Sequence, residues 1–168
     1  DVPFAEITRL LCAAYGRGAV NTVSWHPQNP ESGASAWDGK TATAVSSILP
    51  DGANHAQFRL WLDRLAGFFV GLKSADGTCV PVLFRPFHEH TGSGFWWGEA
   101  QCTPDEYKAL WRFTVEYLRD VKGVHNLLYV YSPDLYRDAE HYTERYPGDE
   151  WVDVLGLDAY HRPQDWDF

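Results

Sequence analysis

The chain has 168 residues, of which 45% are hydrophobic and 15% aromatic, so it can bury the core of one ordinary domain. Its formal net charge of -9 at pH 7 argues against a nucleic-acid partner, because such affinity comes mostly from clustered Lys and Arg. No apolar run approaches the roughly 18 residues that a membrane-spanning helix needs. Three scattered cysteines, Cys12, Cys79 and Cys102, predict neither a disulfide framework nor a zinc site.

The first half of the chain alternates between helical and extended patterns. Apolar residues keep helical spacing over residues 3–15 and Gly16 supplies a stop, which predicts a helix there. Residues 19–25 read as a strand, after which His26 opens a long polar loop that contains Trp37. Loops of that length often carry function. A second helix follows over residues 58–72, with its apolar side chains on one face.

The second half repeats the alternation. Residues 80–84 predict a short buried strand, and Thr103 with Glu106 forms a capping box for a helix that should run to about residue 121. Residues 127–131 and 152–157 predict two more strands. Apolar strands bounded by amphipathic helices indicate an α/β fold with a parallel sheet.

Polar residues follow directly after all four predicted strands. They are His26, Glu89, Asp134, and Asp158 with Tyr160. Because the carboxyl ends of parallel strands share one rim, we expect these residues to gather there. A (β/α)8 barrel and a doubly wound open sheet both predict such a rim.

The run from Phe84 to His90 is the most informative stretch, since it places Glu89 between His88 and His90 and just before the aromatic cluster of Phe95, Trp96 and Trp97. A carboxyl group that acts as a general acid must keep its proton near neutral pH, and aromatic walls that exclude water favour the protonated form. The same walls offer flat apolar faces to pyranose rings. We interpret Glu89 as a general acid/base, Arg85 as a residue that holds a carboxylate beneath the site, and Asp134 as a structural cap.

The run Arg85-Pro86-Phe87-His88-Glu89, followed by Phe95-Trp96-Trp97-Gly98, resembles glycoside hydrolase family 26, best known for β-1,4-mannanases. Trp25-His26-Pro27 and Asp158-Ala159-Tyr160 are further matches. The resemblance implies a (β/α)8 barrel in which Glu89 ends the fourth strand and His88 orients the substrate and the acid/base. The remaining implied substrate-binding residues are His26 and Trp37 on the glycone side, Trp96 and Trp97 beside the cleavage point, and Asp158 and Tyr160 near the nucleophile.

Two departures from the family pattern matter. Family members often have Trp where this chain has Gly94, and the family nucleophile is a glutamate at the end of the seventh strand, which these residues do not include. If Glu89 ends the fourth strand, the four predicted strands are strands three to six. A complete barrel takes about 250 residues. We therefore expect residues 1–168 to form a single partial catalytic domain, an internal fragment that is inactive by itself.

The resemblance implies a retaining endo-β-mannanase that needs no cofactor or metal and acts, as a monomer, on mannan, galactomannan or glucomannan. Such polymers are too large to import, which indicates an extracellular or periplasmic protein. A β-xylanase or mixed-linkage β-glucanase of the same family and a non-catalytic carbohydrate-binding protein remain alternatives. A metal site built from His26, His88, His90 and His161 is disfavoured because no HExxH or Cys/His spacing is present.

Overall fold

The computed structural model describes residues 2–160 and shows an α/β fold with a four-stranded sheet. The long helices are α1 (Phe4–Tyr15), α3 (His55–Val70) and α4 (Pro104–Glu116), and the short ones are α2 (Ala44–Ile48) and α5 (Ala139–Thr143). The strands are β1 (Asn21–Trp25), β2 (Val82–Pro86), β3 (Leu127–Tyr131) and β4 (Val154–Leu155). A 3-10 turn (Asp149–Trp151) precedes β4.

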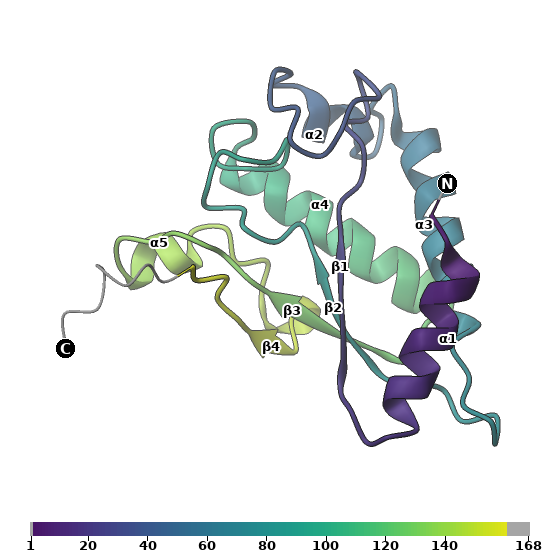
Figure 1. Cartoon of the computed structure of the whole chain (residues 1–168). Coiled ribbons are helices and arrows are strands. Elements are labelled where there is room, and N and C mark those ends of the chain that lie inside the picture. The colour runs from purple at the N-terminus through teal and green to yellow at the C-terminus, as the bar shows by residue number, and fades with distance from the viewer. Residues whose placement is uncertain (1, 161–168) are drawn as a thin grey trace.

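All strand pairs are parallel, and the spatial order β1-β2-β3-β4 equals the chain order. Figure 1 shows this order, with α1 beside β1 and β4 at the other edge of the sheet. A doubly wound sheet would reverse its strand order at a switch point. No reversal occurs among the strands of residues 2–160. Each new strand is added on the same side of the one before it, as in a (β/α)8 barrel.

The two faces of the sheet differ in burial. Val82, Phe84 and Tyr129 lie in register on one face, and they belong to the buried core together with the apolar faces of α3 and α4. On the other face Thr22 is exposed and Leu128 is 45% exposed. Helices therefore cover one face of the sheet and leave the other open.

The three predicted helices are present, although α3 spans His55–Val70 where residues 58–72 were predicted, α4 ends differently, and the short helices α2 and α5 were not predicted. The capping box is present, because Thr103 Oγ1 accepts from the Glu106 amide at 3.2 Å and Glu106 Oε2 accepts from the Thr103 amide at 2.8 Å. The α-helical hydrogen bonding ends at Glu116, and the chain continues as a π-helical turn (Tyr117–Val121). The helical backbone therefore reaches Val121, where the sequence predicts the end of the helix, but its last turn has π-helical hydrogen bonding.

Three predicted strands are displaced or shortened. The strand predicted at 19–25 begins two residues later, at Asn21. The strand predicted at 80–84 is observed at Val82–Pro86, since the register with β1 pairs Ser24 with Arg85 and Trp25 with Pro86. The strand predicted at 152–157 is reduced to Val154–Leu155, which has a neighbour on one side only. An edge strand loses half of its ladder hydrogen bonds, so an apolar pattern alone does not fix its length.

The long polar loop after β1 is ordered around Asn29, whose side chain is fully buried. Its amide donates to the Asp38 carbonyl at 2.7 Å and to Thr41 Oγ1 at 2.8 Å, and its oxygen accepts from the Glu31 amide at 2.9 Å. These bonds bring Trp37 back toward the end of β1.

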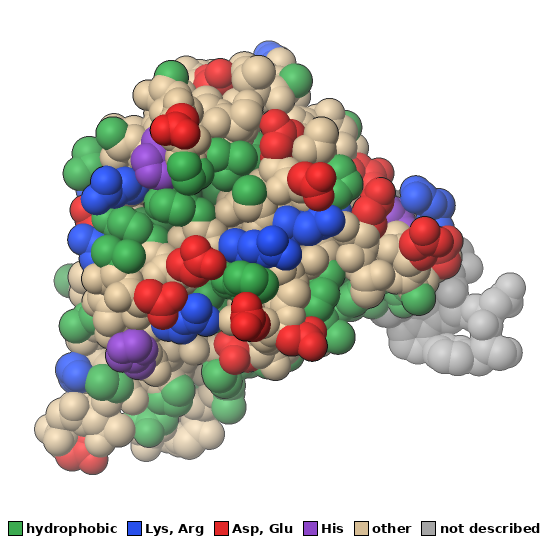
Figure 2. All heavy atoms as spheres, turned by 180° about the vertical axis from the view of Figure 1, so that it is seen from behind, with side chains coloured by type: hydrophobic (Ala, Val, Ile, Leu, Met, Phe, Trp, Pro, Cys, Tyr) green, Lys and Arg blue, Asp and Glu red, His purple; other side chains and the backbone are tan. Residues whose placement is uncertain are grey.

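The outer surface carries charges of both signs. On the face seen in Figure 2 a short row of Lys and Arg side chains lies between Asp and Glu side chains, so this face does not present an extended basic surface. Among residues 2–160, none of the helices is both long and apolar enough to cross a membrane.

Candidate active site

The segment that follows β2 has an unusual backbone. Phe87 has φ +49° and Glu89 has φ +54°, in the left-handed region that residues other than glycine rarely adopt. Each such residue costs about 1–3 kcal/mol and persists only where its surroundings determine it. The surrounding structure therefore holds Glu89 in a backbone conformation that is unfavourable for the residue by itself.

Buried donors hold this segment from two elements. The Tyr107 hydroxyl of α4 donates to the Phe87 carbonyl at 2.9 Å, and Trp97 Nε1 donates to the His88 carbonyl at 2.8 Å. The Glu89 amide donates to the Ser132 carbonyl, just after β3, at 2.8 Å. Together these bonds fix the direction in which the Glu89 side chain leaves the backbone.

A second link joins the ends of β2 and β3. Thr91 Oγ1 donates to the Asp134 carboxylate at 2.8 Å and accepts from the Asp134 amide at 3.2 Å. A Cβ at Gly92 would collide with that carboxylate. Asp134 thus has a structural role, as expected, but it fastens the loop of Glu89 and does not cap a helix.

The carboxyl group of Glu89 meets the residues that follow β4. The Tyr160 hydroxyl donates to Glu89 Oε1 at 2.8 Å, and this hydrogen bond raises the pKa of Tyr160. Arg85 Nη2 donates to the partly buried Asp158 carboxylate. A ring nitrogen of His88 and one carboxylate oxygen from each of Glu89 and Asp158 lie within 4.8 Å of one another. The rim therefore brings together the residues that follow β2 and β4.

Two imidazoles line this rim in their neutral forms. His88 is 4% exposed, and burial, with His26 and Arg85 nearby, lowers its pKa to about 4. Burial also lowers the pKa of His26. The two rings meet edge to face with centroids 4.6 Å apart. At neutral pH they can position polar groups without adding charge beside Glu89.

An exposed aromatic surface continues from His26. Trp37 is 63% exposed and stacks on His26 with centroids 5.5 Å apart and planes 21° from parallel. Phe95 supports both rings, at 5.3 Å from Trp37 and 5.5 Å from His26. An indole held flat in this way offers a face on which a pyranose ring can stack.

The expectation that Trp96 and Trp97 contact substrate needs correction. Both side chains have 0% exposure, and their indole N–H groups donate to the carbonyls of Pro27 and His88. They lie in the core beneath the aromatic surface, where they support the wall without presenting a face to solvent. Glycine-flanked tryptophans in a loop resemble a binding platform in sequence, and only the packing distinguishes the two roles.

The convergence of histidines expected of a metal site is also not observed. His88 faces His26, whereas His90 is fully buried between Tyr107 and Tyr131, at 4.4 and 4.7 Å between ring centroids. The strand ends at Pro86, so the alternation that would place His88 and His90 on one face does not extend to them. His161 lies outside the described residues.

Three contributors were missed by sequence reasoning. Phe95 supports the exposed ring of Trp37, Tyr107 holds the Phe87 carbonyl, and Ser132 accepts from the Glu89 amide. Phe95 belongs to the aromatic motif and could have been assigned from it. Tyr107 reads as one more residue of an apolar helix stripe, and Ser132 acts through its backbone, which no side-chain pattern reveals.

An ionisable carboxyl at the end of a central parallel strand, beside an exposed aromatic surface, is typical of glycoside hydrolases. The family model for glycosyl hydrolase family 26 matches residues 6–167, and the chain belongs to this family.

Relatives in sequence and in structure agree. A mannan endo-1,4-beta-mannosidase of Bifidobacterium adolescentis is 47% identical over 149 residues, which are 88% of this chain and 15% of that protein. The structure of a GH26 beta-mannanase from Bacteroides ovatus superposes with a TM-score of 0.94 at 45% identity, covering 98% of this chain and 48% of that one. A modular endo-beta-1,4-mannanase from Cellulomonas fimi gives a TM-score of 0.89 at 45% identity, covering 94% of this chain and 35% of that one. The chain thus spans less than half of the length of these relatives.

Proposed function

We propose that this chain is part of the catalytic domain of a retaining endo-β-1,4-mannanase, in which Glu89 is the general acid/base. The observation that carries the proposal is the position of Glu89. The strained backbone around it is held by buried donors to the carbonyls of Phe87 and His88, and its carboxyl group lies at the rim with Asp158 and Tyr160. Below, the complete domain means the protein that contains these residues together with the rest of its barrel.

We further propose that β1 to β4 are strands three to six of a (β/α)8 barrel. The sequential parallel order and the single helix-covered face support this assignment, as does the superposition on GH26 structures at TM-scores of 0.94 and 0.89. In a barrel the open face, which carries Thr22 and Leu128, would become the interior. The free edges of β1 and β4 would then pair with the second and seventh strands.

A retaining glycosidase needs two carboxyl groups about 5–5.5 Å apart. Glu89 protonates the glycosidic oxygen as the bond to the anomeric carbon breaks, and later removes a proton from the water that releases the sugar. Tyr160 binds Oε1, so Oε2 is the oxygen that can face the substrate. In family 26 the nucleophile is a glutamate at the end of the seventh strand, in the remainder of the barrel, and Asp158, which Arg85 binds, would lie near it as a substrate-binding residue.

The neighbouring residues have distinct parts in this mechanism. Trp37 stacks on a sugar ring on the glycone side, and His26 keeps the indole in place from behind. His88 is neutral at neutral pH, so it can bind a sugar hydroxyl without stabilising the ionised form of Glu89 through an added positive charge. The substrate is a mannan-type polysaccharide, and a polymer of that size places the enzyme outside the cytoplasm, in the periplasm or the medium.

The first test is reducing-sugar release by the complete domain from mannan, xylan and mixed-linkage glucan. We expect release from mannan. Release from xylan or glucan alone would assign a different polymer, and binding of mannan without release would make the protein a carbohydrate-binding one.

The second test is Glu89→Ala in the complete domain, which removes the proton donor. We expect kcat/KM on mannan to fall by about 100- to 10,000-fold. An aryl β-mannoside with a good leaving group needs no proton in the first step, so its kcat/KM should fall far less. The matched control is Glu140→Gln, an exposed carboxyl on α5, which should leave both values unchanged. Equal losses on the two substrates would contradict the acid/base assignment.

A further inference from the structure

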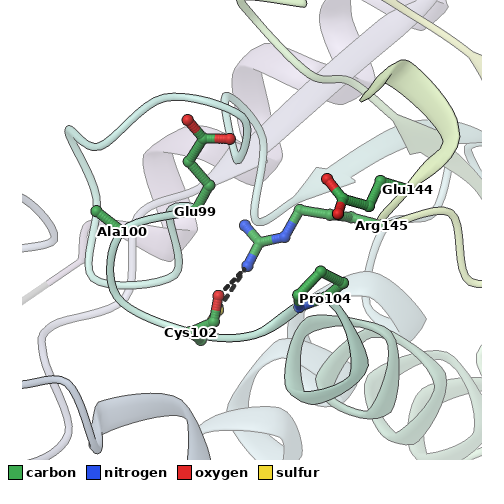
Figure 3. A pocket seen from close by; sticks show the side chains of 6 residues that line it. All are labelled: Glu99, Ala100, Cys102, Pro104, Glu144 and Arg145. Atoms are coloured by element: carbon green, nitrogen blue, oxygen red, sulfur yellow. Dashed lines mark hydrogen bonds between the residues drawn. The ribbon is translucent and has the colours of Figure 1, made fainter. Parts of the chain in front are cut away.

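Arg145 is a buried arginine that forms no ion pair with the described residues, and its side chain binds backbone instead. It is 1% exposed. Nη1 donates to the carbonyl of His90 at 2.6 Å, and Nη2 donates to the carbonyl of Cys102 at 2.7 Å and to Cys102 Sγ at 2.9 Å. Figure 3 shows the Arg145 guanidinium pointing toward Cys102, with its hydrogen bonds to that residue dashed. A buried cation is costly unless it is hydrogen-bonded, and here carbonyl oxygens serve that purpose.

These contacts join two segments that are far apart in sequence. Arg145 follows α5, after β3, while its carbonyl partners lie in the loop that leads from Glu89 to α4. The longer contacts, to the carbonyls of Trp97 at 3.3 Å and Thr103 at 3.4 Å, are to the same loop. The guanidinium therefore fastens the whole loop to the segment that follows β3.

The guanidinium also lies over the ring of Tyr107, with its central carbon 4.7 Å from the ring centroid. Tyr107 in turn donates to the Phe87 carbonyl. Arg145 and Tyr107, packed together, thus bind the carbonyl groups of Phe87 and His90, which enclose His88 and Glu89. The two positive φ values of this segment, at Phe87 and Glu89, lie within residues 87–90.

We propose that Arg145 is a positioning residue for the acid/base, which acts by binding the His90 carbonyl and so keeping Glu89 in its left-handed conformation. Without this bond the backbone that follows Glu89 loses its buried donor, so Glu89 can relax toward an ordinary φ. Such a rotation redirects the Glu89 side chain. The catalytic part of this inference rests on the proposed function, whereas the backbone part does not.

A purely structural role would give a different pattern. Loss of stability lowers the fraction of folded enzyme and reduces activity on every substrate by the same factor. Loss of positioning acts on the proton transfer, so it reduces kcat/KM on mannan and largely spares a substrate that needs no proton. Misplacement of a catalytic group by about 1 Å can cost about 100-fold.

The variant to test is Arg145→Met in the complete domain, with Arg112→Met as the matched control. Arg112 also binds a carbonyl of this region, that of Pro147 at 2.7 Å, and stacks on Trp151, but it contacts neither the Glu89 loop nor Tyr107. For Arg145→Met we expect kcat/KM on mannan to fall about 100-fold and on the activated aryl mannoside less than about fivefold. For Arg112→Met any loss should be equal on both substrates. An equal loss for Arg145→Met would overturn the inference.

A second measurement is independent of the reaction. The Glu89 amide donates to the Ser132 carbonyl, so its hydrogen exchange reports the backbone conformation directly. Exchange at Glu89 should rise at least about tenfold in Arg145→Met relative to Arg112→Met, and unchanged protection would overturn the inference. If exchange rises while the wild-type domain cleaves none of the tested glycans, the backbone role of Arg145 stands and the proposed function fails.

If Arg145→Met does not fold, Tyr107→Phe keeps the inference testable. It removes the hydroxyl that binds the Phe87 carbonyl and retains the ring beneath the guanidinium. We expect the same two effects at smaller size, with mannan activity falling about tenfold. Faster exchange at Glu89 with no selective loss on mannan, or no change in exchange, would contradict positioning from this side of the loop.

Discussion

The two sides of the candidate site are held in different ways. On one side, the backbone just before Glu89 is bound by fully buried donors, because Tyr107 donates to the Phe87 carbonyl and Trp97 to the His88 carbonyl. On the other side, Tyr160 is 81% exposed and follows an edge strand of two residues. Its contact with Glu89 is a single hydrogen bond between side chains.

This difference indicates that the two sides of the site depend on different parts of the structure. Glu89, the proposed acid/base, is preorganised by the core of residues 2–160, because the carbonyls of Phe87, His88 and His90 have buried donors and the Glu89 amide donates to the Ser132 carbonyl. The Asp158 side depends on its ion pair with Arg85 and on an edge that a complete barrel would cover. Changes to the core should therefore alter stability and activity together, whereas changes at the edge should alter activity alone.

The largest effect is expected for Trp97→Ala. It removes a fully buried indole and leaves the His88 carbonyl without its donor, so the free energy of unfolding should fall by about 3–5 kcal/mol. Trp37→Ala is the matched control, since that indole is 63% exposed, and its stability change should stay within about 0.5 kcal/mol. Urea unfolding of both variants measures the difference.

For substrate binding we expect the opposite order, with the larger effect in the Trp37 variant. Trp37→Ala should raise KM for mannan while the fold is intact, because a stacking face for the sugar is lost. Similar stability losses in the two variants would contradict the division between a buried support and an exposed platform.

A smaller loss of stability is expected at acidic pH. The pKa of His88 is lowered to about 4, from 6.5, and burial puts the pKa of His90 well below its usual value. The unfolded chain then binds more protons than the folded one between these values, so stability rises with pH in this window and falls as pH drops from about 6.5 to 4. His88 alone accounts for a loss of about 3 kcal/mol. Melting temperature as a function of pH measures this.

The variant His90→Phe tests how much His90 contributes to this pH dependence of stability. His90 packs between Tyr107 and Tyr131, and neither of its ring nitrogens has a hydrogen-bond partner within residues 2–160, so phenylalanine can replace it in shape. The variant should lose less stability on acidification than the wild type. An unchanged acid dependence would show that His90 does not contribute.

Much of the fold follows from the sequence. Apolar strands, an amphipathic α3 and the capping box of α4 are local patterns, and local patterns survive folding when packing agrees with them. The exceptions involve pairing between distant segments. β2 is displaced toward Arg85 by its register with β1, and β4 is short because it lies at an edge.

The site was only partly predictable for a related reason. Glu89, His88 and Asp158 are identified by their position after strands and by their chemistry. Tryptophan burial is not, since Trp37 and Trp97 both read as aromatic residues in polar loops, and only three-dimensional packing makes one a surface and the other a support. Arg145 gave no sequence signal, because it binds carbonyl groups, which every residue has.

The smallest effect is expected for Tyr160→Phe, which removes the hydroxyl bound to Glu89 Oε1 and leaves an exposed ring. A hydrogen bond of this kind contributes about 0.5–1.5 kcal/mol, so kcat/KM on mannan should fall about 3- to 10-fold, with stability unchanged. Because Tyr160 holds the side chain and not the backbone, hydrogen exchange at the Glu89 amide should stay at its wild-type rate. Faster exchange at Glu89 in this variant would show that the edge also fixes the backbone, and the contrast between the two sides of the site would then be wrong.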